Sequence, residues 1–220
     1  MREFRSGETN SWGWGFGLKD KFKDPTCNGG IWGALFCIAA TMAVSAILIA
    51  SAMAGAKPDA SASQAAFQQV YRVLTSPRCQ NCHPAGEAPL QGDDSHGHLQ
   101  NVKRGKDGHG VTAMRCDTCH QTANLAGAHM PPGNPKWALP SPEHKMVFVG
   151  RSAGELCRQL KNPKENGGRT LDQIFHHIAD DDLVGWGWNP GEGRALPPLS
   201  RPDTVAQLRI WIDGGAACPD

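Results

Sequence analysis

Apolar side chains recur with the helical period of about 3.6 residues in four segments after residue 57. The first segment, residues 61–75, begins at a possible capping box of Ser61 and Gln64 and ends at Ser76-Pro77. Its predicted buried face consists of Phe67, Val70, Tyr71 and Leu74. The pattern predicts an amphipathic helix that packs on one side against a core.

The other three helical segments lie in the last third of the chain. Ser152 with Glu155 forms a capping box for a short helix, Thr170 caps the next, and Asp203 caps the last, which Gly214-Gly215 ends. The predicted apolar stripes are Leu171, Ile174, Phe175 and Ile178 in the third helix and Val205, Leu208, Trp211 and Ile212 in the fourth. No segment alternates well enough to predict a strand, so the pattern indicates a mainly α domain.

Residues 84–114 form a long segment that is rich in Gly, Asp and His and has no clear period. A structureless loop of this length is uncommon inside a compact domain. We therefore expect this loop-rich segment to be ordered by packing around a bound group.

A run without charged residues, 31–54, precedes the predicted domain. At 1.5 Å per residue, a helix of this length is long enough to cross a hydrocarbon core of about 30 Å. Lysines precede the run at positions 19, 21 and 23, and this bias predicts a cytoplasmic leader, residues 1–30, and export of residues 57–220. Small residues at 52–56 fit a signal-peptidase site, so an uncleaved transmembrane anchor and a cleaved signal both remain open.

The net charge is close to zero, with 22 Lys and Arg against 21 Asp and Glu. A nucleic-acid-binding protein has a clustered basic excess, so the composition argues against such a partner. Two of the eight cysteines, Cys27 and Cys37, lie before or inside the apolar run, which leaves six in the exported part.

Four of these six cysteines stand in two C-x-x-C-H motifs. The first motif is Cys79-Gln80-Asn81-Cys82-His83, and the second motif is Cys116-Asp117-Thr118-Cys119-His120. In an exported protein this spacing is the attachment signature of c-type haem, with two thioether bonds and the histidine as proximal iron ligand. A zinc site would use four thiolates and leave both histidines unexplained, and a thioredoxin-like dithiol needs a βαβ context that is absent. The motifs predict two covalently attached haem c groups.

The sixth iron ligands are predicted to come from His98, His177 and Met146, of which at most two are axial. His98 and the alternative His96 lie in the loop-rich segment, and Met146 precedes the apolar run Val147-Phe148-Val149. His177 is preferred to His176 because it lies nearer the apolar stripe of its helix. The histidines at 109, 129 and 144 have polar or loop neighbours and are expected to be solvated.

Cys157 and Cys218 remain, each on or beside a predicted helix. In an oxidising compartment they are expected to form a disulfide, which closes a loop of about 60 residues and stabilises the fold by about 4 kcal/mol. Two buried thiols are the alternative, and a thiolate ligand at Cys157 has no further support.

The exported part resembles a family of small secreted dihaem cytochromes c associated with periplasmic molybdenum hydroxylases of the isoquinoline 1-oxidoreductase-like type. The matching segments are 77–86, 90–94, 104–108, 114–121, 183–188, 190–191, 211–213 and 216–219, together with His96, His98, Met146, Gly150, Cys157 and His177. The resemblance implies a cytochrome c-like, loop-rich dihaem domain. The chain departs from the family in its long leader and long apolar run, where the family has an ordinary signal peptide.

Three functions fit these features. The first is a non-enzymatic electron-transfer protein on the periplasmic side of the inner membrane, which exchanges electrons with a redox partner protein or a membrane complex. The second is a haem enzyme of the dihaem peroxidase type, which needs a labile sixth position and an acid-base group. The third is a structural haem subunit of a membrane complex, tethered through residues 31–54.

Overall fold

The computed structural model describes residues 59–220, which belong to one unit, Lys57–Asp220. The predicted leader, 1–30, and the apolar segment, 31–54, lie outside the described residues. Within 59–220 no helix has both the length and the apolar character needed to cross a membrane. Of the described residues 40% are helical and 5% are in strands, which confirms the mainly α prediction.

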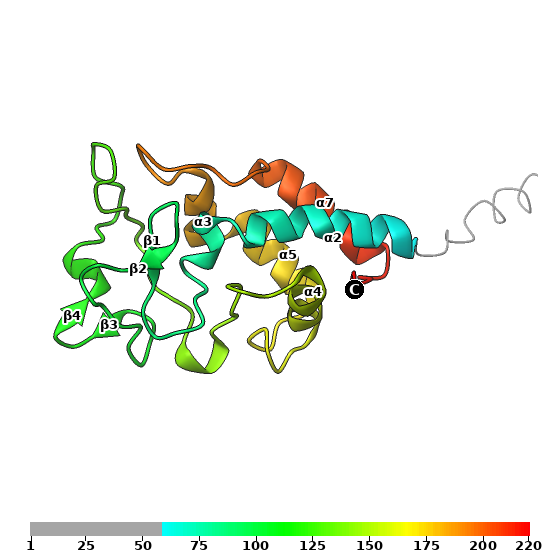
Figure 1. Ribbon diagram of the computed structural model, residues 1–220, viewed down its shortest axis with the longest axis horizontal. Helices are drawn as coiled ribbons and strands as arrows, with labels where there is room; N and C mark the ends of the chain where they lie inside the picture. Colours follow the sequence, from blue (N-terminus) through cyan, green and yellow to red (C-terminus); the bar gives the residue numbers. More distant parts are fainter. Residues whose placement is uncertain (1–58) are drawn as a thin grey trace, which may run out of the picture. The chain divides into compact units, whose positions relative to one another are not determined.

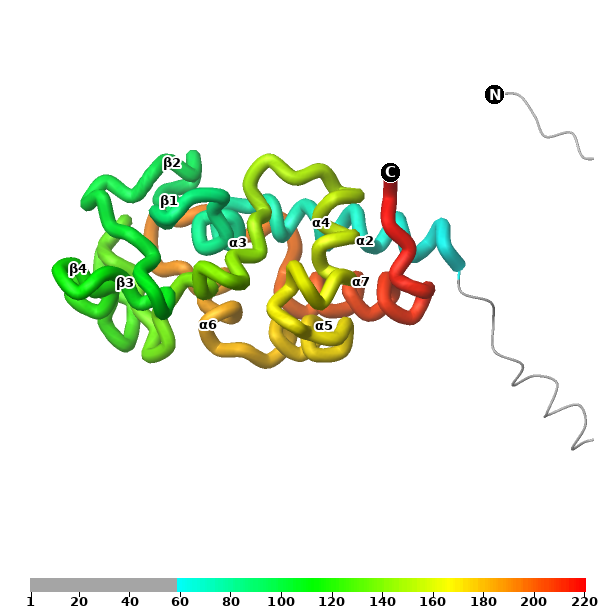
Figure 2. Tube along the Cα trace, turned by 90° about the horizontal axis from the view of Figure 1, so that it is seen from below, coloured from blue at the N-terminus to red at the C-terminus, as the bar shows by residue number. Residues whose placement is uncertain are grey.

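The longer helices gather at one end of this unit and the strands at the other (Figures 1 and 2). The α-helices are α2 (Ala60–Leu74), α3 (Pro77–Gln80), α4 (Ala153–Lys161), α5 (Leu171–Asp180), α6 (Asp182–Gly185) and α7 (Arg201–Asp213). Single turns of 3-10 helix occur at Cys116–Thr118, Pro142–His144 and Trp186–Trp188. The two ends therefore differ in kind, with helix packing at one and loops at the other.

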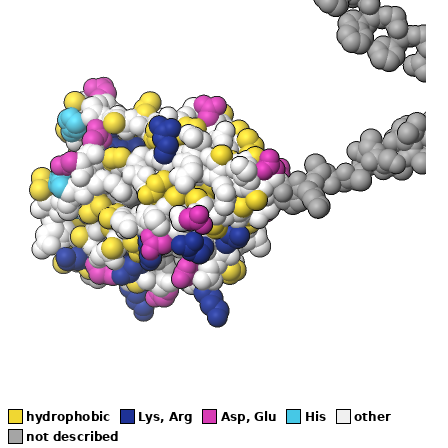
Figure 3. Space-filling model, turned by 45° about the vertical axis from the view of Figure 1, so that its right-hand side comes forward, with side chains coloured by type: hydrophobic (Ala, Val, Ile, Leu, Met, Phe, Trp, Pro, Cys, Tyr) yellow, Lys and Arg dark blue, Asp and Glu magenta, His cyan; other side chains and the backbone are white. Residues whose placement is uncertain are grey.

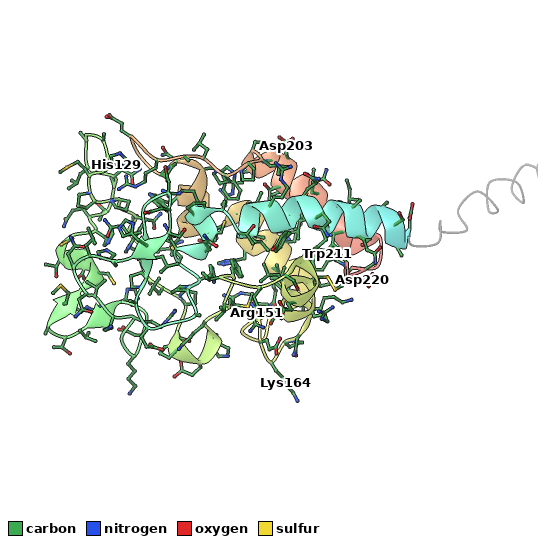
Figure 4. All side chains as sticks on the ribbon, in the orientation of Figure 1. His129, Arg151, Lys164, Asp203, Trp211 and Asp220 are labelled. Atoms are coloured by element: carbon green, nitrogen blue, oxygen red, sulfur yellow. A yellow bond between two sulfur atoms is a disulfide. The ribbon has the colours of Figure 1, made fainter. Side chains whose placement is uncertain are left out.

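The helical end has an apolar core built mainly where α2 packs against α7 (Figure 1). Phe67 and Trp211 are completely buried, with ring centres 4.9 Å apart, and Figure 4 shows Trp211 among the helices. The buried Ser63 hydroxyl donates to the Trp211 carbonyl at 2.7 Å, so this buried polar side chain is satisfied. The three predicted apolar stripes supply seven of the thirteen buried residues of this core.

Two of the four predicted helix starts are wrong by a few residues. The N-cap of α2 is Asp59, whose carboxylate accepts from the backbone N–H groups of Ser61 and Ala62. The N-cap of α7 is Ser200, and Asp203 is the residue whose N–H it accepts. In both segments several capping side chains stand within a few residues, and the sequence does not distinguish among them. The capping box of Ser152 and Glu155 and the Thr170 cap are confirmed.

The loop-rich end contains two short hairpins, so the expectation of no strands is wrong. β1 (Leu90–Gln91) pairs antiparallel with β2 (His96–Gly97), and β3 (Gly110–Val111) pairs with β4 (Met114–Arg115). Strands of two residues are too short to produce a readable alternation.

A buried arginine also orders the loop-rich segment. Arg104 has no exposed surface, and its guanidinium donates to the carbonyls of Pro140 and Gly86. Its backbone N–H donates to the Glu87 carbonyl at 2.6 Å. These bonds tie three separate stretches of loop together, so contacts within the chain itself order part of this segment.

The predicted disulfide between Cys157 and Cys218 is confirmed, with an S–S distance of 2.06 Å. Cys157 is buried in α4, and Cys218 follows α7. The bond therefore fixes the end of the chain to the core. On the face that Figure 3 shows, acidic and basic side chains are interspersed, in keeping with the near-zero net charge.

Candidate functional site

The first motif begins inside α3, whose N-cap is Ser76 and whose first turn contains Pro77. Backbone bonds from Cys82 to the Cys79 carbonyl and from His83 to the Gln80 carbonyl continue the turn through the motif. Burial raises the pKa of the Cys79 thiol to about 12 and that of Cys82 to about 11. Both thiols are free and protonated at neutral pH, unlike the low-pKa cysteines of reactive dithiols.

A hydrogen bond and a stacking contact fix the His83 imidazole. Its Nδ1 donates to the carbonyl of Met146 at 2.8 Å, with the Lys145 carbonyl at 3.3 Å. Its ring stacks on Phe148, with ring centres 4.0 Å apart and planes at 16°. Burial lowers the pKa of His83 to about 4, so the ring is neutral. Because a carbonyl only accepts, Nδ1 carries the proton and Nε2 keeps its lone pair.

His83 lines a cavity of about 270 Å³, called the first cavity below. This is far more than the roughly 10–15 Å³ that one water needs. Both cysteines of the first motif line it, and so do Met146 and His177. Its apolar walls include Leu74, Phe148, Ile174, Ile178, Trp186 and Trp188. The thiols and the histidine of one motif therefore face one large, mainly apolar space that α5 helps to line.

His177 reaches the first cavity from α5, where it is half-buried. Burial lowers the pKa of His177, and the negative charge of Asp181 partly offsets this lowering. The Asp181 carboxylate lies 3.6 Å from Nδ1 of His177. A carboxylate near one ring nitrogen is the usual setting of a metal-ligating histidine. The neighbouring His176 is exposed and pairs with Asp180. Of these two adjacent histidines, therefore, only His177 lines the cavity.

Met146 lines the same cavity but lies behind His83. Its carbonyl accepts from His83 Nδ1, and its sulfur lies 3.9 Å from the Gln159 amide nitrogen. Its backbone has a positive φ of 49°, a conformation that side chains other than glycine rarely adopt. Met146 therefore contributes its backbone to the setting of His83.

The second motif holds its histidine as the first motif does, although its second cysteine, Cys119, is exposed. A 3-10 turn carries Cys116, and His120 donates its backbone N–H to the Cys116 carbonyl at 2.9 Å. His120 Nδ1 donates to the Pro132 carbonyl at 2.8 Å, and its ring stacks on Trp137 at 4.4 Å and 12°. Burial lowers its pKa, so this imidazole is also neutral with Nε2 free.

His98 is the side chain that faces His120. The two ring centres lie 6.3 Å apart with planes at 67°. When two imidazole nitrogens bind one metal ion from opposite sides at about 2.0 Å each, the centres of the two rings lie about 6 Å apart. Nδ1 of His98 is buried without a hydrogen-bond partner, and burial lowers the pKa of this side chain. The distance between the two ring centres therefore matches that of two imidazoles on opposite sides of one metal ion.

The other histidines are placed as follows. Nδ1 of His96 lies 2.6 Å from the Asp94 carboxylate and its Nε2 is buried without a partner, so it stays an alternative to His98. His129 is exposed at the loop-rich end (Figure 4), His144 is exposed at the edge of the first cavity, and His109 is half-buried. Among residues 59–220 no three His, Cys, Asp or Glu side chains converge on a point that would hold a metal ion. The zinc alternative therefore has no four-thiolate group in the described part.

Three contributors to these sites were not predicted. Phe148 and Trp137 support the two motif histidines, and neither stands at a fixed distance from its motif. Arg78 lines the first cavity, is buried and pairs with Asp93 at 2.6 Å, while its Nε has no partner. The position of Arg78 directly before Cys79 was the one available signal.

Comparisons with known proteins add no relative. No protein-family model matches the chain, and neither a curated protein nor a solved structure is similar to it. The resemblance to small dihaem cytochromes therefore stays a prediction.

Proposed function

We propose that residues 57–220 form a cytochrome c-like electron carrier with two covalently attached haem c groups. The proposal rests on one observation, namely that His83 and His120 make matching contacts. Each follows a pair of free cysteines, donates Nδ1 to a carbonyl, stacks on an aromatic ring and is kept neutral by burial. A neutral imidazole with a fixed tautomer is what an axial iron ligand requires.

In this proposal Cys79 and Cys82 attach one haem and Cys116 and Cys119 the other. A haem iron supplies reversible one-electron storage when bound. The chain holds the proximal imidazoles neutral, and the apolar walls of the first cavity exclude water there. Exclusion of water and a fixed ligand set keep an electron carrier from becoming a catalyst.

We assign the sixth positions to His177 at the first site and His98 at the second. His177 lines the same cavity as His83, and His98 faces His120 at a spacing that suits one ion. Met146 is assigned the positioning role, because its carbonyl anchors the nitrogen of His83 that does not bind iron. With both sixth positions filled by protein, neither site has the open coordination of a peroxidase.

The partner and place of action follow from the sequence. An export segment at 31–54 and two haem sites favour a redox protein or membrane complex on the periplasmic side of the inner membrane as partner. Retention of that segment would tether the carrier to the membrane, and its removal would release it.

Optical and EPR spectra of the exported protein in its oxidised and reduced states test the function. The proposal predicts two six-coordinate low-spin haems that accept and return electrons without turnover of hydrogen peroxide. A high-spin ferric haem together with peroxide turnover would instead favour the peroxidase alternative. Stoichiometric co-purification with a membrane complex, without electron exchange, would favour the structural subunit.

A further inference from the structure

A chain of aromatic contacts runs from the second motif to the first cavity. His120 stacks on Trp137, with ring centres 4.4 Å apart. Trp137 meets the ring of Trp186 edge to face, at 4.9 Å and 87°. Trp186 in turn lines the first cavity, together with the cysteines of the first motif. Three rings therefore lead from the second motif to the wall of the first cavity.

The position of Trp186 is fixed by Asn124. The indole Nε1–H donates to Asn124 Oδ1 at 2.9 Å, and the Gly133 N–H donates to the same oxygen at 3.0 Å. The Asn124 amide donates to the Asn189 carbonyl at 2.9 Å. Gly133 directly follows Pro132, whose carbonyl holds His120. One asparagine thus ties Trp186 to the loop that anchors the second motif.

We propose that Trp137 and Trp186 are the electronic connection between the two sites. The inference rests on the proposed function and adds the route by which its two centres exchange electrons. In one exchange the ferrous centre loses one electron and the ferric centre gains it, while both indoles stay in their resting state and no proton moves. Stacked and edge-to-face rings are in van der Waals contact, whereas the covalent path between the motifs runs through the whole loop-rich segment.

The chain offers a matched control for this route. Trp188 lines the same cavity, and its indole donates to the Leu199 carbonyl at 2.8 Å. The guanidinium carbon of Arg201 lies 5.9 Å from the centre of the Trp188 ring. Trp188 forms no ring pair with Trp137, which pairs with Trp186 instead. Trp186→Leu and Trp188→Leu therefore remove equal side-chain volume from one cavity wall, but only the first breaks the aromatic connection.

The experiment measures electron equilibration between the haems after photoreduction of the fully oxidised protein. Haem content by intact mass and the low-spin EPR signals are recorded for each variant. We expect Trp186→Leu to slow the equilibration several-fold with both EPR signals kept, Trp188→Leu to slow it much less, and Trp186→Phe to restore most of the wild-type rate. Trp137→Leu interrupts the same route at its other ring and replaces Trp186→Leu if that variant does not accumulate.

Equal rates in Trp186→Leu and the wild type, with both haems present, would overturn the route and leave the proposed function standing. Equal slowing in Trp186→Leu and Trp188→Leu would also overturn it, because general loosening of the cavity wall would then be the cause. A wild-type protein without two low-spin haems would overturn the proposed function itself.

Discussion

The imidazole rings of His98 and His120 lie 6.3 Å apart at an angle of 67°, although His98 belongs to the loop after β2 and His120 to the second motif. At the first motif, His177 and His83 both line the first cavity. These two relationships are the basis on which we propose His98 and His177, among seven histidines outside the motifs, as the sixth ligands. They lead directly to a test by substitution.

His98→Ala and His177→Ala are each expected to convert one of the two haems from low spin to high spin. The reason is that each substitution removes the neutral imidazole assigned to one sixth position. The ferric EPR spectrum measures the change, one haem at a time. His176→Ala is the control, because this neighbouring side chain is exposed and pairs with Asp180.

Two outcomes would reject these ligand assignments. If His98→Ala leaves both signals unchanged and His96→Ala converts one, the second site uses the buried Nε2 of His96. If Met146→Leu converts a haem and His177→Ala does not, the first site uses the thioether.

Phe148→Ala is expected to destabilise the fold by about 3–5 kcal/mol, because a buried aromatic ring is replaced by a cavity. It also removes the ring on which His83 stacks, so the EPR signal of the first haem should broaden or shift. Denaturant unfolding and EPR measure the two effects. In Phe175→Ala, which removes a half-buried ring that contacts Arg209, the first haem's signal should stay unchanged.

Loss of the Cys157–Cys218 disulfide is expected to lower the free energy of unfolding by about 4 kcal/mol, because its loop is long. The double variant Cys157→Ala/Cys218→Ala should keep both haems, since neither cysteine belongs to a motif. Unfolding midpoints of the double variant and the wild type give the difference. Equal midpoints would show that the bond does not constrain the unfolded chain.

The α4 capping box predicts a pH dependence. The N–H and hydroxyl of Ser152 lower the pKa of Glu155 below its ordinary value of 4.5, and Arg151 and Arg158 add to this. The unfolded chain therefore binds this proton more readily, so the stabilisation is present above pH 4.5 and is lost as the pH falls below it. Glu155→Gln keeps the hydrogen bond and should lose less stability than the wild type on acidification. Parallel losses in the two proteins would contradict the prediction.

Much of the helical end was predictable because its signals are local. Apolar stripes such as Phe67 with Val70 and the capping box of Ser152 with Glu155 lie within one or two turns of helix, where spacing determines contact. The cap of α7 was misplaced because Ser200 and Asp203 are both capping residues three positions apart. Two-residue strands such as β1 have no pattern long enough to detect.

The residues of the candidate site also fall into those that local sequence predicts and those that it does not. The motifs contain their cysteines and histidines at fixed spacing, so these residues were predictable. Phe148 and Trp137 meet His83 and His120 across stretches of loop, and nothing in their own neighbourhoods marks them. The contact between Trp137 and Trp186 is longer in range still and emerges only from the folded chain.

The intact mass of the protein under denaturing conditions tests the central claim most directly. The account predicts a chain heavier than its polypeptide by two haem groups. Cys79→Ala/Cys82→Ala and Cys116→Ala/Cys119→Ala should each lose one of them, while the other haem stays attached. A mass equal to that of the polypeptide alone, from cells that attach haem to other c-type cytochromes, would contradict the account.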